Sequence, residues 1–282
     1  MNNTIVLCPN PYRDRGLALT LQAKKILEDA GFKAIVSPVF VEIPENSPMT
    51  PLQDSAAEAS MIISFGGDGT FLHVARAVIG SDIPLLGVNV GTKGFMASIE
   101  PEEIALVARA AAGEFRQSRR MTMEVELQRE GGIIYKNCAI NDVVVKSDVS
   151  CIGLNVTADG VGISCFSGDG VIIATPTGST AYSMSAGGPI VEPEAHNLLV
   201  TPICAHVMAA TAFVLSSERR LVVTPERLRG RRALLSVDGS EAMELEGGDE
   251  IHVFRSKNSV IVADMGIRSF YDTAFDKLTH CM

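Results

Sequence analysis

The segment Ser64-Phe65-Gly66-Gly67-Asp68-Gly69-Thr70 follows an apolar run, 61–63, and precedes a run, 71–78, that is typical of a helix start. A strand, a glycine turn and a helix bring free backbone N–H groups and a positive helix end to one point, which suits phosphate oxygens. The turn lacks the Gly-Lys-Ser/Thr ending of a P-loop. A carboxylate there, Asp68, is costly among phosphates unless it holds a metal ion or takes a proton. The segment therefore predicts chemistry on a phosphorylated substrate, although a tight turn with Asp68 as helix cap is the alternative.

Composition narrows the class of protein. The chain has 282 residues, enough for two domains, and 46% of them are hydrophobic. The formal net charge of −9 argues against nucleic-acid binding. Six cysteines without a CxxC pair are typical of reduced, buried thiols and speak against a zinc site. No signal peptide is apparent. The longest apolar stretch, 198–215, is interrupted by Pro202 and His206, so it is too short to span a bilayer and is interpreted as a core strand with the segment that follows it. We expect a cytoplasmic protein without a membrane partner.

The first third of the chain alternates strands and helices. Expected strands cover 5–8, 32–36, 60–65 and 84–88; expected helices cover 16–30, 71–79 and 102–112, with a loop at 44–51. Strands separated by helices predict a parallel sheet with right-handed crossovers. We place this α/β domain at residues 1–117, and residues 268–282 could pack back on it.

From Thr122 onward the pattern changes to short runs rich in Val and Ile. Expected strands cover 124–128, 133–138, 143–146, 154–157, 171–174, 221–224, 234–237, 250–254 and 260–264. One helix is expected near 179–186. Short strands with turns between them predict a largely antiparallel β domain, which we place at 118–267.

A hydroxyl-rich run, Thr175-Pro176-Thr177-Gly178-Ser179-Thr180-Ala181-Tyr182-Ser183-Met184-Ser185, follows Gly168-Asp169-Gly170 and one expected strand. Ser179 could cap the helix, and a capped helix alone would explain part of the run. Thr180 and Tyr182 could present hydroxyls to a polar ligand. The flanking Asp169 favours a binding site.

Asn141-Asp142 interrupts an apolar run. A turn or bulge is the simpler interpretation, but an aspartate can also accept both hydroxyls of a ribose. Two further features stay open. The segment Asn89–Phe95 is a ligand loop or a plain turn, and His73 faces either the mouth of the first site or solvent.

These motifs, taken in order, resemble those of the NAD kinases. The matching segments are Gly66–Thr70, Asn141-Asp142, Asp169-Gly170, Thr175–Ser183 and Gly187-Gly188-Pro189. The first motif is shared with diacylglycerol and sphingosine kinases, whereas the run from Thr175 is much more specific. The resemblance covers nearly the whole chain. It implies a Rossmann-like parallel-sheet domain followed by a mainly antiparallel β domain.

The resemblance implies phosphoryl transfer from ATP, or in some members polyphosphate, to the 2′-hydroxyl of the adenosine ribose of NAD. Mg²⁺ would bridge the donor phosphates, and homodimers or homotetramers are expected. Asp68 would be the base that accepts the hydroxyl proton. Gly66, Gly67 and Thr70 would hold the phosphates of ATP, and Gly69 would lie against the dinucleotide.

Asn141 and Asp142 would hold adenine and ribose hydroxyls, although family members usually carry Glu where Asp142 stands. The other expected contacts to NAD are His73, Phe95, Asp169, Thr180, Ala181, Tyr182 and Ser185. Two alternatives remain at this point. A lipid kinase would share the first motif but needs a membrane cue, and no basic amphipathic helix is apparent. A non-catalytic dinucleotide sensor would not need Asp68.

Overall fold

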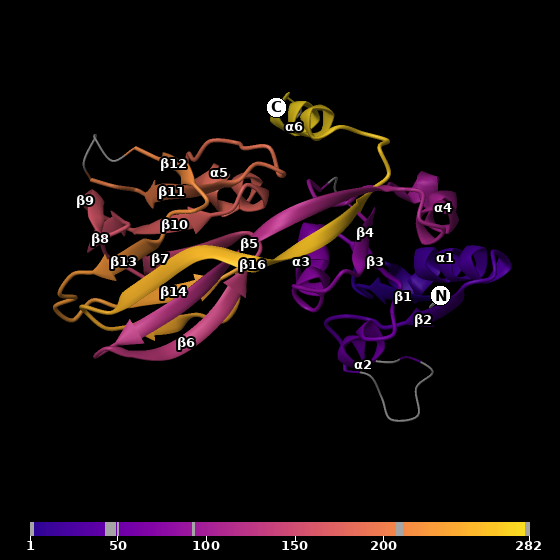
Figure 1. The fold of residues 1–282 in the computed structure, drawn as a ribbon, viewed down its shortest axis with the longest axis horizontal. Coiled ribbons are helices and arrows are strands. Elements are labelled where there is room, and N and C mark those ends of the chain that lie inside the picture. The colour runs from indigo at the N-terminus through magenta and orange to yellow at the C-terminus, as the bar shows by residue number, and fades with distance from the viewer. Residues whose placement is uncertain (1–2, 43–48, 50, 92–93, 207–210, 280–282) are drawn as a thin grey trace. The chain divides into compact units, whose positions relative to one another are not determined.

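The computed structural model forms two compact units (Figure 1). It describes residues 3–42, 49, 51–91, 94–206 and 211–279. Unit 1 comprises Met1–Arg119 and Ser259–Met282, and unit 2 comprises Arg120–Asn258. Two long strands, β5 (Arg116–Arg129) and β16 (Glu250–Asp264), each contain residues of both units.

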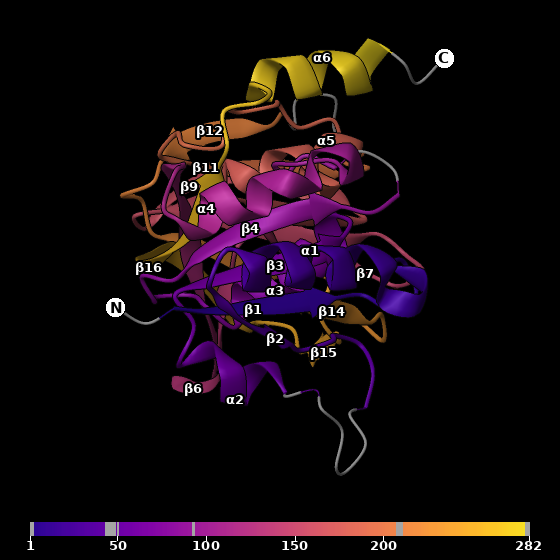
Figure 2. The same ribbon diagram turned by 90° about the vertical axis from the view of Figure 1, so that its right-hand side faces the viewer.

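Unit 1 is built on a parallel sheet, as the sequence predicts (Figure 2). Its strands are β1 (Thr4–Pro9), β2 (Lys33–Val36), β3 (Met61–Gly66) and β4 (Pro84–Asn89), in the order β2-β1-β3-β4. Residues 261–262 of β16 add beside β4, and every neighbouring pair is parallel. β1 and β3 are buried along their whole length, because apolar side chains fill both faces of a sheet that helices cover.

Unit 1 also contains helices and 3₁₀ turns. They are η1 (Arg15–Leu17), α1 (Ala18–Asp29), α2 (Leu52–Ala56), α3 (Asp68–Arg76), η2 (Pro101–Leu106), α4 (Val107–Ala111) and α6 (Phe270–Thr279). The helix expected at 102–112 begins instead as a 3₁₀ turn behind a capping box of Glu100 and Glu103. α2 was not predicted. Most of the expected loop 44–51 lies outside the described residues.

Unit 2 contains two antiparallel layers. One sheet has six strands in the order β12-β11-β10-β7-β14-β15. They are β7 (Asp142–Ser147), β10 (Gly170–Ala174), β11 (Asn197–Ile203), β12 (Phe213–Ser216), β14 (Ala233–Val237) and β15 (Met243–Leu245). In the other layer, residues 251–253 of β16 pair with β13 (Leu221–Pro225). β13 pairs in turn with β8 (Ile152–Ala158), and β8 pairs with β9 (Val161–Gly168). β6 (Gly132–Ala139) pairs with β5.

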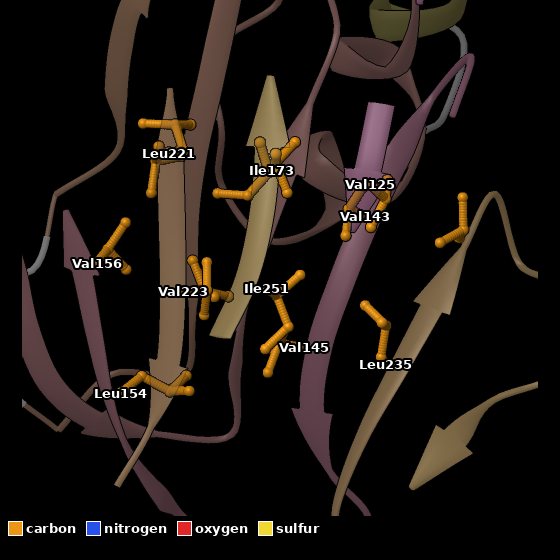
Figure 3. Close-up of a cluster of buried hydrophobic side chains, with 14 of the residues drawn as sticks. Val125, Val143, Val145, Leu154, Val156, Ile173, Leu221, Val223, Leu235 and Ile251 are labelled. Atoms are coloured by element: carbon orange, nitrogen blue, oxygen red, sulfur yellow. The ribbon is translucent and has the colours of Figure 1, made fainter. Parts of the chain in front are cut away.

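The core of unit 2 lies between these layers (Figure 3). Every second residue of the strands points inward, and each of these side chains is at most 1% exposed: Val143, Val145, Ile173, Leu154, Val156, Leu221, Val223 and Ile251. Full burial of such a side chain contributes about 1.5–3 kcal/mol. This core holds β7 and β10, from which the polar motifs at 141–142 and 175–180 extend.

Some expectations were wrong in detail. The runs 250–254 and 260–264 form a single strand, β16, which continues through the polar residues between them and pairs with β5. β9, β12 and β15 were not predicted, since they are short or carry weak apolar patterns. Of the five cysteines in the described part of the chain, Cys8 alone is buried, whereas Cys165 and Cys204 are exposed.

Candidate active site

The carboxyl ends of β1 and β3 meet at the edge of the unit 1 sheet. β2 lies on one side of β1 in the sheet, and β3 lies on the other side. The direction in which successive strands are added therefore reverses between β1 and β3. Ligands of open α/β sheets bind at such a switch point. Residues 10–13 follow β1 at this edge, and the glycine turn at Gly67 follows β3. The topology therefore places the glycine turn where a ligand site is expected.

The glycine turn is fastened to the loop after β1. The Asn10 side-chain amide donates to Thr70 Oγ1 at 3.0 Å, and the Asn10 backbone N–H donates to the Phe65 carbonyl at 2.9 Å. A Cβ at Gly66 would collide with the Thr70 side chain, so this position requires glycine. The turn thus holds the first N–H groups of α3 in a fixed place, as an anion site needs.

Asp68 is the first residue of α3, and its carboxylate is held by backbone. The Phe95 N–H donates to Oδ2 at 2.9 Å, and the Met96 N–H donates to Oδ1 at 3.1 Å. The N-cap residue is Gly67, so the alternative of Asp68 as helix cap is wrong. A Cβ at Gly94 would overlap Asp68 Oδ1, so glycine lets this loop approach closely. The loop residues Thr92 and Lys93 lie outside the described residues.

A cavity of about 420 Å³ opens beside this carboxylate. Its lining residues are Asn10, Arg13, Phe40, Gly67, Asp68, Gly69, Thr70, Gly94 and Lys277. Within the part of the chain that the structure describes, neither Arg13 nor Lys277 has a carboxylate within ion-pair distance. The lining therefore carries two unneutralised cations and one anion, in a chain whose net charge is −9. This balance suits a phosphate-bearing ligand.

His73 lies one turn further along α3 and packs against Phe40, with ring centroids 4.4 Å apart and ring planes tilted by 47°. Burial, and then the positive charge of Arg76, lower the pKa of His73. His73 is not part of the cavity lining. Phe95 is joined to the cavity through its N–H to Asp68. The contacts of His73 and Phe95 with a dinucleotide stay predictions.

In unit 2, Asp238 shapes the Asn141-Asp142 turn. One carboxylate accepts three backbone N–H bonds, from Ile140 at 2.8 Å, Asn141 at 2.7 Å and Asp142 at 3.0 Å. The Asp238 N–H returns a bond to the Asp142 carbonyl at 2.9 Å. Asp238 has a φ of 50° and precedes Gly239, so the Asp-Gly dipeptide after β14 is the signal that could have indicated this turn.

Asp142 is the first residue of β7 and is only 5% exposed. Burial, and second the negative charge of Asp238, raise the pKa of Asp142 to about 7. The Asn141 Oδ1 atom is buried without a partner among the described residues. Buried polar atoms are normally bonded, so this amide oxygen is a candidate for a ligand contact.

The hydroxyl-rich run packs on the same turn. Thr175 Oγ1 donates to the Ile140 carbonyl at 2.6 Å and accepts from the Gly178 N–H at 3.1 Å. A Cβ at Gly178 would overlap the Asn141 carbonyl. Thr177 Oγ1 is also buried without a partner in the described part of the chain. The structure thus brings together the two motifs that the sequence separates by more than thirty residues.

The expected helix at 179–186 is two short pieces, η3 (Thr177–Thr180) and α5 (Tyr182–Ser185). Ser179 does not cap it. Its hydroxyl instead exchanges bonds with the backbone of Val191, donating at 3.1 Å and accepting at 3.0 Å. The predicted NAD contacts Thr180, Ala181, Tyr182 and Ser185 lie at the surface of this segment, and Tyr182 is 39% exposed.

Asp169 lies between β9 and β10, next to the side chain of Cys151. The Cys151 thiol lies 3.5 Å from Asp169 Oδ1 and 3.1 Å from His206 Nε2. His206 is exposed, because the apolar strand β11 ends before it, at Ile203. Burial, and then Asp169, raise the pKa of Cys151.

Comparisons with known proteins agree with these motifs. The ATP-NAD kinase N-terminal domain matches residues 7–114, and the ATP-NAD kinase C-terminal domain matches residues 140–265. The NAD kinase of Ruminiclostridium cellulolyticum is 32% identical over 272 residues, which cover 95% of each chain. The chain belongs to the NAD kinase family. The NAD kinase of Syntrophotalea carbinolica is 38% identical over 77% of each chain.

Two solved structures of this family share the fold. The yeast NADH kinase complexed with NADH has a TM-score of 0.84 at 25% identity, covering 99% of this chain and 87% of that one. An NAD kinase from Archaeoglobus fulgidus in complex with ATP has a TM-score of 0.72 at 24% identity, covering 93% and 94%. The resemblance to the NAD kinase family and the expected fold class are confirmed. None of the described helices has the length and apolar character to cross a bilayer.

Proposed function

We propose that this member of the NAD kinase family transfers the terminal phosphoryl group of ATP to the 2′-hydroxyl of the adenosine ribose of NAD, giving NADP. The observation that carries the proposal is Asp68, held beside the glycine turn in a cavity with two unneutralised cations. The named relatives are NAD kinases, so a lipid kinase or a non-catalytic sensor is not favoured.

The phosphates of the donor would lie against the glycine turn. Phosphoryl transfer passes through a loose transition state, so the enzyme mainly positions the reactants and neutralises charge. The N–H groups at the start of α3 and the cation Arg13 supply that charge in the cavity.

Asp68 would orient the acceptor hydroxyl and take its proton late in the transfer. Each carboxylate oxygen accepts one backbone N–H and keeps a lone pair for a further bond. Because the two donors come from the loop at 95–96, the carboxylate is fixed before substrate arrives. The carboxylate therefore needs no reorganisation when the acceptor hydroxyl binds.

The cavity fits a Mg²⁺ ion that arrives with ATP. Mg²⁺ is commonly bound by one or two carboxylates together with substrate phosphates and waters. Asp68 is the carboxylate of the lining, and the described residues contain no group of three or more His, Cys, Asp or Glu side chains placed to hold a metal. Asp68 and the donor phosphates would hold the ion, which would neutralise phosphate charge.

Residues of unit 2 would bind the acceptor. The resemblance assigns Asn141 and Asp142 to the adenine and ribose hydroxyls. The unpartnered Asn141 Oδ1 and the buried Asp142 carboxyl support that assignment. We also propose that the protein is a cytoplasmic homodimer or homotetramer. Light scattering after gel filtration of the purified protein would test the oligomeric state.

The decisive assay measures NADP formation from NAD and ATP with Mg²⁺, using an NADP-specific dehydrogenase to detect product. Polyphosphate in place of ATP, and NADH in place of NAD, test the donor and the redox form of the acceptor. Diacylglycerol with labelled ATP is the control for lipid kinase activity. Absence of NADP with either donor would contradict the proposed function.

A further inference from the structure

The C-terminal helix α6 brings a cation to the cavity beside Asp68. Lys277 lines that cavity, although 209 positions separate the two residues in the sequence. Both residues belong to unit 1. We propose that Lys277 is a phosphate-binding residue for the triphosphate donor and that α6 forms part of the donor-binding site. This inference rests on the proposed kinase function.

One aromatic side chain, Phe95, contacts α6 at two positions. Lys277 Nζ lies 4.1 Å from the centroid of the Phe95 ring, and the Phe270 ring lies 6.5 Å from the same ring. The Phe95 N–H donates to Asp68. A short series of contacts therefore fixes the position of the lysine relative to the carboxylate.

The contact with Phe95 leaves the ammonium available for a ligand. A lysine ammonium has three donors, and the face of a ring satisfies the charge only in part. Within the described residues, Lys277 makes no ion pair. An ammonium on a ring, facing a cavity with a glycine turn, is suited to phosphate oxygens as a point charge.

A purely structural role is the competing explanation. α6 buries none of its residues, and Tyr271, Phe275 and Leu278 are 57–66% exposed. If Lys277 only attached the helix to Phe95, its loss would loosen α6 and would disturb donor and acceptor binding together. If Lys277 binds phosphate, its loss would act on the donor alone.

The test compares Lys277→Gln and Lys277→Arg with Lys25→Gln, an exposed lysine on α1 away from the cavity. We expect Lys277→Gln to raise the KM for ATP by about 10-fold or more, the loss of one charge-assisted hydrogen bond. The KM for NAD should stay within about twofold. Lys277→Arg should recover most of the affinity, and Lys25→Gln should match wild type.

Inorganic tripolyphosphate gives a second readout. It should inhibit wild type competitively against ATP, and Lys277→Gln should weaken that inhibition by about as much as it raises the KM for ATP. An unchanged KM for ATP, or equal increases in both KM values with a lower melting temperature, would overturn the inference. A wild-type protein that makes no NADP would instead contradict the proposed function.

Discussion

Asp68 and Asp142 are the same residue type in opposite surroundings. Asp68 is partly exposed, is held by two N–H groups and shares its cavity with two cations. Asp142 is buried beside a second carboxylate, Asp238, and its pKa is raised to about 7. The surroundings therefore give the two aspartates different roles. Asp68 is suited to accept a proton from a reacting group, and Asp142 is suited to exchange hydrogen bonds with hydroxyls.

The largest effect is expected at Asp68. Asp68→Asn removes the proton acceptor but keeps the side-chain volume, so NADP turnover should fall about 100-fold or more while NAD still binds. Turnover is measured by the coupled assay, and NAD binding by calorimetry. Asp29→Asn, an exposed position at the end of α1, is the matched control. Near-normal turnover in Asp68→Asn would remove Asp68 from its role.

A smaller effect is expected from Gly94→Ala. The added methyl overlaps Asp68 Oδ1 and must displace the carboxylate or the loop. A displacement of about 1 Å can cost up to 10²-fold, so we expect turnover to fall by about 10- to 100-fold. Gly162→Ala adds a methyl in open space on β9 and should leave turnover unchanged. Equal turnover in the two variants would show that the fixed orientation of Asp68 is unimportant.

On the acceptor side, Asp238→Asn tests the turn that holds Asn141 and Asp142. An amide nitrogen cannot accept a hydrogen bond, so at least one of the three bonds to 140–142 is lost. We expect the KM for NAD to rise by about tenfold with little change in the KM for ATP. Ser240→Ala, in the same hairpin, controls for general loosening of the turn. An increase in the KM for ATP alone would be inconsistent with this assignment.

The smallest effect concerns stability and pH. The pKa of Asp142 is about 7 in the folded state and is raised from an ordinary value of 3.8, so the folded state holds the proton more tightly than the unfolded state. The stabilisation that the protonated Asp142 carboxyl provides therefore decreases as pH rises and is lost once pH passes about 7. Between pH 6 and pH 8 the free energy of unfolding of wild type should fall by about 1 kcal/mol relative to Asp142→Asn. Urea unfolding at the two pH values measures it, and parallel curves for both proteins would contradict the raised pKa.

Local patterns predicted much of the fold. The apolar run before Gly66 and the alternation of strands and helices gave the parallel sheet of unit 1, because buried strands and amphipathic helices have short-range signatures. The polar middle of β16 shows no such signature, and β16 as a whole pairs with β5, which lies more than a hundred residues away in the sequence. Two expected strands therefore proved to be one.

The partners of the site residues could not be predicted. The sequence indicated Asp68, Asn141 and Asp142, because polar residues in glycine-rich or apolar runs are conspicuous. Asp68 is held by the loop at 95–96, and Asn141 by Asp238, which lies 97 positions away. Lys277 reaches the cavity from the end of the chain. Such contacts follow from tertiary packing and leave no local pattern.

The most direct measurement is a crystal structure of the protein with NAD bound, refined well enough to place the adenosine ribose. We predict an Asp68 carboxylate oxygen within about 2.6–3.2 Å of the ribose 2′-oxygen, with the Phe95 and Met96 N–H bonds retained. An acid that points away from that oxygen, in a complex where the dinucleotide is fully ordered, would contradict its assignment as the base.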